Sequence, residues 1–186
     1  MPNAYLPRPL VHEWSDEIGN HTERHQASLS RLLKSQRRLI RWVIENAEHL
    51  DGPTVGVTQY LVGVLARIFD LAGGRLKSAT WEQVRDAERR IGAVAGELLP
   101  FDDGFAERVR KVEWRAQPHL LDEALYSLFE RDADDEEEEP LDDTQSGKVF
   151  LLMWVATEVL DQNWKPPKDL ELLDSYTFTP IEPSED

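Results

Sequence analysis

The segment "VGVTQYLVGVLARIFDLA" (residues 55–72) is apolar around almost its whole circumference when it is drawn as a helix. A helix on the surface of a globular protein carries its apolar residues along one side only. This segment therefore predicts a helix over about 54–72 that other elements enclose, ending before Gly73 and Gly74. A second enclosed helix is predicted over about 144–163, because "VFLLMWVA" (149–156) is uninterrupted apolar sequence.

Amphipathic helices are predicted around these two. One spans about 20–50 and stops at "DGP" (51–53), and another begins at Thr80, where Gln83 completes a capping box. Two shorter helices are expected at about 103–116 and 118–131. The sequence thus predicts an all-α, single-domain bundle of five or six helices over 1–165, followed by an extended, proline-containing tail over 166–186.

The composition argues against several kinds of functional site and partner. The chain has no cysteine, which excludes disulfides, thiolate metal sites and cysteine nucleophiles. Its first residues lack a basic start followed by an apolar run, and no stretch approaches the ~20 apolar residues of a membrane span. We therefore expect a cytoplasmic protein that does not bind membranes. The net charge of −15 argues against a nucleic-acid partner, because phosphates repel it.

Nine of the twelve residues in "DADDEEEEPLDD" (132–143) are acidic. Spaced acids are typical of calcium loops, but Glu137 occupies the position at which such a loop requires glycine. The mutual repulsion of the acids predicts a mobile, solvated loop between two helices. Contact of this run with a basic partner is the alternative.

A basic stripe precedes the first enclosed helix. Six basic residues and no acidic one lie between Arg24 and Arg41. On one continuous helix, Arg24, Arg31 and Arg38 form a column with Arg41 beside it, and Trp42 lies on the same side. Because tryptophan and arginine often dominate binding energy, these five residues form a hypothetical partner-binding surface. Alternatively, another helix or the tail covers Trp42.

The segment "HTERH" (21–25) carries a second possible metal-binding pattern. His21 and His25 are one helical turn apart and Glu17 is one turn earlier, so the three can share a metal ion. A metalloprotease would need glutamate where Thr22 stands. Such pairs are more often the polar margin of a buried seam. No cofactor is expected, and no catalytic set of residues is recognisable.

These observations favour a non-enzymatic protein that acts by binding another macromolecule, with a protein as the expected partner. An adaptor, an assembly factor and an acidic inhibitor of the antitoxin or immunity type all fit this description. The alternative is a helical-bundle enzyme or sensor that holds a metal or small ligand with His21 and His25. The identity of the partner and the oligomeric state stay open.

Overall fold

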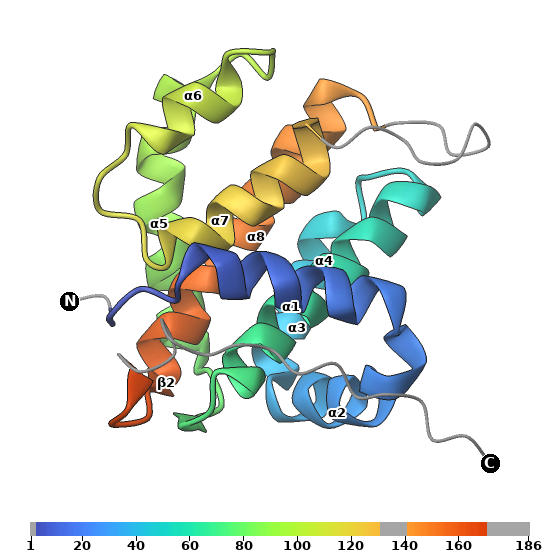
Figure 1. The fold of residues 1–186 in the computed structure, drawn as a ribbon. Coiled ribbons are helices and arrows are strands. Elements are labelled where there is room, and N and C mark those ends of the chain that lie inside the picture. The colour runs from blue at the N-terminus through green and yellow to red at the C-terminus, as the bar shows by residue number, and fades with distance from the viewer. Residues whose placement is uncertain (1–2, 131–140, 171–186) are drawn as a thin grey trace.

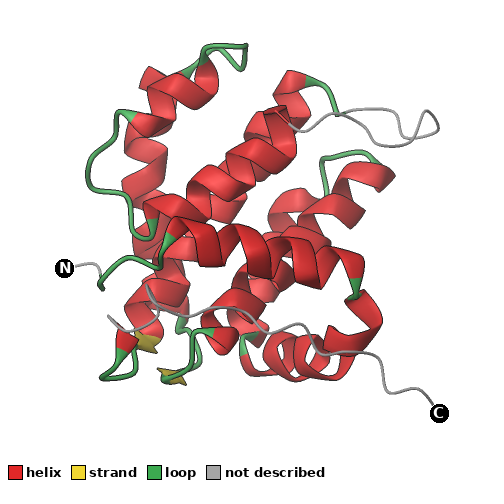
Figure 2. Cartoon of the chain, viewed as in Figure 1, coloured by secondary structure: helices red, strands yellow, loops and turns green. Residues whose placement is uncertain are grey.

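The computed structural model describes residues 3–130 and 141–170, and these residues form a helical bundle (Figures 1 and 2). Two short strands, β1 (Arg75–Leu76) and β2 (Trp164–Lys165), pair antiparallel, and a π-helical turn η1 (Tyr126–Glu130) extends the seventh helix. The described α-helices are α1 (Arg8–Asn20), α2 (Thr22–Ser35), α3 (Arg37–Ala47), α4 (Gly52–Leu71), α5 (Trp81–Leu98), α6 (Phe105–Arg110), α7 (Pro118–Leu125) and α8 (Asp143–Asn163).

The all-α bundle is confirmed. Helix α4 packs on α8, which also contacts α3, α5 and α7. Phe150, Met153 and Trp154 of α8 are fully buried, as is Phe69 of α4. Helix α1 contacts α4 and α7, and in Figure 1 it passes in front of α4. The two apolar segments thus supply much of the core, and α1 covers one side of it.

The described residues contain eight α-helices rather than the five or six expected, because the predicted helix 20–50 is interrupted. Helix α1 begins before it, and breaks at His21 and Gln36 separate α1, α2 and α3. Gln36 is only 1% exposed, and its side chain donates to the Lys77 carbonyl and accepts from the Ala79 amide. These distant bonds hold a turn inside sequence whose periodicity is continuous.

Helix α4 corrects one expectation about membranes. By length and composition it is apolar enough to span a bilayer, so the statement that no stretch approaches this limit was wrong. Within the fold, 56% of the 18-residue apolar stretch of α4 is buried. The core helix of a globular domain can be equally long and apolar, so the composition of α4 alone does not indicate that it spans a membrane.

Two predicted segments fall largely outside the described residues. Of the acidic run 132–143 the structure describes only 141–143, where the Asp142 side chain accepts a hydrogen bond from the Gln145 amide and caps α8. Of the tail 166–186 it describes only 166–170. The mobile acidic loop and the extended tail therefore stay predictions.

Gly147→Ala is expected to lower the free energy of unfolding by about 1–3 kcal/mol, because a Cβ at this position in α8 would overlap the ring of Phe101. That ring packs edge-on against Phe105, 5.2 Å away between ring centroids. Gly92→Ala in α5 is the control: no atom lies within 4 Å of the added Cβ, so it should stabilise by up to ~1 kcal/mol. Urea unfolding of both variants measures the difference, and equal stabilities would contradict the clash.

Candidate functional site

Helix α1 is positioned by one apolar side. Pro9 stands in its first turn, where a missing amide hydrogen leaves no bond unmade. The opposite side presents His12 and Asp16, one turn apart, to solvent. The residues that face α4 and α7 and are buried are Leu10, Val11, Trp14 and Ile18.

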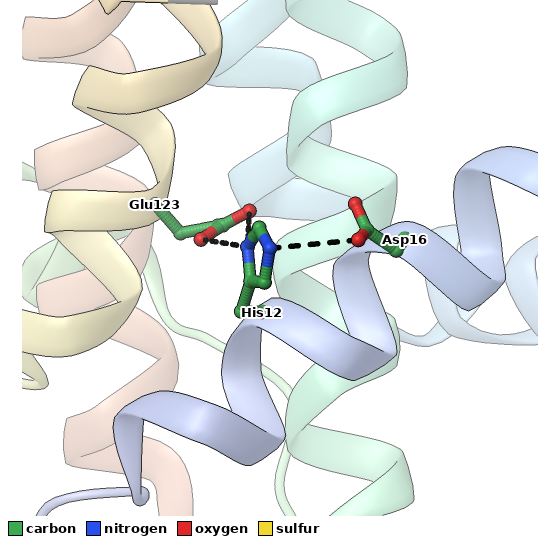
Figure 3. Close-up of side chains that lie close together, drawn as sticks. All are labelled: His12, Asp16 and Glu123. Carbon is green, nitrogen blue, oxygen red and sulfur yellow. Dashed lines mark hydrogen bonds and ion pairs between the residues drawn. The ribbon is translucent and has the colours of Figure 1, made fainter.

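His12 lies between two carboxylates from different helices (Figure 3). Its Nδ1 is 3.1 Å from each carboxylate oxygen of Glu123 on α7, and its Nε2 is 3.5 Å from Asp16 Oδ2. Because a carboxylate can only accept, Nδ1 carries the proton and donates it to Glu123. The Nε2 atom faces a second acceptor, Asp16 Oδ2, at 3.5 Å.

Three exposed tyrosines border α1. The Tyr126 ring lies edge-on to His12 with centroids 6.1 Å apart, and Tyr5 lies edge-on to His119 of α7 at 6.2 Å. The Tyr60 hydroxyl lies beside Gly19 near the end of α1, 3.1 Å from where a Cβ would be. Between 40% and 49% of each tyrosine is exposed.

A shallow hollow lies between α1, α4 and α7. Ser15, Leu61, Glu123 and Ser127 are among the residues that line it. Its volume of about 10 Å³ admits roughly one water, far less than a metabolite needs. The candidate site is therefore the surface around the hollow and not the hollow itself. We call it the α1 face and define it as Tyr5, His12, Asp16, Tyr60, Glu123 and Tyr126.

The structure also brings Glu17, His21 and His25 together. The Glu17 carboxylate lies 3.7 Å from His21 Nε2 and 3.8 Å from His25 Nε2, but Arg24 is within 3.6 Å of it as well. His25 Nδ1 accepts a hydrogen bond from Arg67, and burial together with the Arg67 charge lowers the pKa of His25. A neutral His25 therefore carries its proton on Nε2, and neither nitrogen has a lone pair left for a metal.

The predicted partner-binding stripe is only partly assembled. Trp42 is 7% exposed and belongs to the core, which corrects its expected place on the basic side. The physical reason is tertiary packing: Trp42 follows Arg38 by one turn within α3, and α3 packs against α4, α5 and α8, so Trp42 is buried while Arg38 stays exposed. The four arginines are exposed, and each has an acceptor: Glu17 for Arg24, Asp70 for Arg31, the Ala79 carbonyl for Arg38 and Glu45 for Arg41.

A buried polar cluster ties the N-terminal segment to α7 and α8. Gln117 is fully buried, accepts from the Leu6 amide at 2.8 Å, and donates to the Ala4 carbonyl and to Asp161 at 2.8 Å. Asn3 donates to the same Asp161 carboxylate from its backbone and side-chain nitrogens. Because these groups are enclosed, we assign them to stability rather than to ligand binding.

Sequence reasoning missed the α1 face. The spacing of His12 and Asp16 at i and i+4 was a usable signal, and the buried positions of residues 8–20 repeat with helical period. Nothing in the sequence links His12 to Glu123, because 111 positions separate them.

No family model matches the chain, and no curated protein or solved structure shows significant similarity to it.

Proposed function

We propose that the protein acts by binding a partner protein through the α1 face. One observation carries the proposal: three of the six large apolar or aromatic side chains exposed in the described residues border the same helix. Tyrosine joins a large contact area to a polar tip and is enriched among residues that dominate binding energy. Gathered aromatic side chains on a surface are typical of interaction sites.

Charge gives the partner's chemistry. Asp16 and Glu123 lie within the α1 face, and the whole chain has a net charge of −15. A partner with arginine and lysine at its contact surface would be steered toward this face, and its cations can stack on tyrosine rings. The partner that we propose is therefore a basic protein. Of the roles expected from sequence, an acidic inhibitor fits this best.

The other hypotheses have less support. A metal-dependent enzyme or sensor built on His21 and His25 would need His25 to give up its bond from Arg67, with two arginines close to the ion. The stripe of Arg24, Arg31, Arg38 and Arg41 lacks its tryptophan, and the acceptors around it offset part of its charge.

Tyr126→Ala is expected to weaken binding of the purified partner at least tenfold, about 1.4 kcal/mol, because a central tyrosine at an interface contributes this much. Ile44→Ala on α3 is the matched control, since Ile44 is exposed to a similar extent (39% against 40%) but lies outside the α1 face. It should change the affinity less than twofold. The partner is first captured from the host, and titration calorimetry with each variant then gives the dissociation constants.

The dependence of the binding affinity on salt concentration tests whether charged groups contribute to the interface. The affinity of the unmodified protein should fall as ionic strength rises, and Asp16→Asn should reduce that dependence. A partner whose binding responds to Ile44→Ala but not to Tyr126→Ala would place the interface elsewhere. Failure to obtain any stoichiometric protein partner would contradict the binding role itself.

A further inference from the structure

We infer that His12 and Asp16 bind a zinc ion, with Glu123 holding the imidazole in the orientation that binding requires. This inference does not depend on a protein partner, because it concerns the isolated chain. The three side chains are the one group of potential metal ligands that the described residues bring within 4.8 Å of one another.

The orientation of the ring is the first support. Both oxygens of Glu123 lie 3.1 Å from Nδ1, so they hold a proton on that nitrogen, and zinc can bind Nε2 in place of a proton there. A carboxylate that accepts from one ring nitrogen while the other binds metal is the common arrangement around histidine ligands. Glu123 has 14% of its side chain exposed, against 52% for His12, so the anchor is more enclosed than the ligand.

The spacing of the two ligand atoms is the second support. His12 Nε2 and Asp16 Oδ2 are 3.5 Å apart. With bonds of about 2.1 Å from zinc to each atom, this spacing corresponds to an angle of roughly 115° at the metal, close to tetrahedral. Because the residues are one turn apart on the same helix, binding needs no movement of α1. Water completes the coordination on the exposed side, where Asp16 is 63% exposed.

The local charges favour a cation here over the cluster at Glu17. Within the described part of the chain, the ion pairs of Asp16 and Glu123 are with His12 alone. At Glu17, in contrast, Arg24 already neutralises the carboxylate and Arg67 occupies His25. A mixed nitrogen and oxygen ligand set suits zinc, whereas a hard ion such as magnesium prefers oxygen alone.

The experiment is a calorimetric titration of the full, untagged chain with zinc chloride in a buffer that contains millimolar magnesium. Magnesium competes with zinc for sites made only of carboxylates, so it lowers the contribution of the acidic run 132–143 to the signal. We expect saturation at one zinc per chain. His12→Ala should abolish this binding, and Asp16→Asn should weaken it at least tenfold.

Glu123 is a positioning residue. Its variants distinguish its effect on the orientation of the His12 ring from the effect of its negative charge. Glu123→Ala should weaken zinc binding 10–100-fold, the range found for such supporting partners. Glu123→Gln keeps an oxygen that accepts from Nδ1, and it should restore part of the lost affinity. His21→Ala, at the end of the same helix, is the control and should leave the titration unchanged.

Three results would overturn the inference. They are the absence of saturable zinc binding, binding that persists in His12→Ala, and binding that is lost in His21→Ala. His12 and Asp16 are exposed, so their substitution should leave the fold intact. Circular dichroism of each variant checks that a loss of zinc binding is not caused by unfolding. A zinc site without a protein partner, or a partner without zinc binding, would separate this inference from the proposed function.

Discussion

Gln117→Ala is expected to lower the free energy of unfolding by about 3–5 kcal/mol, the largest effect that we predict for a single substitution. Gln117 is fully buried and is the only side chain that bonds both the N-terminal segment and Asp161 within the described residues. Alanine leaves the Leu6 amide without its acceptor and removes one donor from a carboxylate that is 3% exposed. Each buried group left unpaired costs about 1–3 kcal/mol, and a charged group costs more.

The backbone at Gln117 allows a matched comparison. Its φ of 45° and ψ of 60° lie in the left-handed region, which glycine adopts freely and other residues adopt at a cost of about 1–2 kcal/mol. Gln117→Gly removes the same side-chain bonds but relieves this strain, so it should be about 1 kcal/mol less destabilising than the alanine variant. Equal effects would show that the left-handed conformation contributes nothing.

Urea unfolding followed by tryptophan fluorescence measures both variants. Asn3→Ala is a second arm, because Asn3 donates to the same carboxylate. The effects of substituting two residues that share a partner do not add. The change in the free energy of unfolding of the double variant should therefore differ from the sum of the changes in the single variants. If Gln117→Ala unfolds at the same urea concentration as the unmodified protein, the cluster does not stabilise the fold.

Local signals in the sequence predicted the fold class and the limits of several helices. The capping box at Thr80 is present, and α4 and α8 begin and end within two residues of the predicted limits. These features are readable because the residues that cause them lie within one or two turns of each other.

Long-range contacts explain what the sequence did not show. The break at Gln36 depends on Lys77 and Ala79, more than forty positions away. Trp42 lies in the core because α3 packs against α4, α5 and α8, and a helical wheel does not show which side of a helix its neighbours cover. The pairing of His12 with Glu123 likewise depends on how α1 crosses α7, which the pattern of neither helix specifies.

Glu158 gives the second large effect, and it varies with pH. This carboxylate of α8 is 6% exposed and accepts from the Ala116 amide at 2.8 Å and from the Trp154 indole at 3.3 Å. Glu158→Ala leaves both donors unpaired in the core, so we expect a loss of about 2–4 kcal/mol. Glu158→Gln keeps an acceptor oxygen for both and places its amide toward Arg90, which is half exposed and can move away.

Burial raises the pKa of Glu158 above its ordinary value of 4.5. The folded state therefore holds this proton more tightly than the unfolded state does. The stabilisation from the protonated form is complete below pH 4.5, and it is lost as the pH rises through the folded-state pKa. Glutamine has no proton to lose, so the Glu158→Gln variant should become more stable relative to the unmodified protein as the pH rises from 4 to 8.

A second titration runs in the opposite direction. Burial and Arg67 lower the pKa of His25, so the stability linked to its neutral form is lost as the pH falls below about 6.5. His25 is present in both proteins and is not among the groups that shift the pKa of Glu158, so its contribution cancels in the difference. Urea unfolding of both proteins at each pH therefore measures the contribution of Glu158 to the free energy of unfolding. A difference that stays constant from pH 4 to 8 would mean that the buried carboxylate keeps its ordinary pKa in the folded protein.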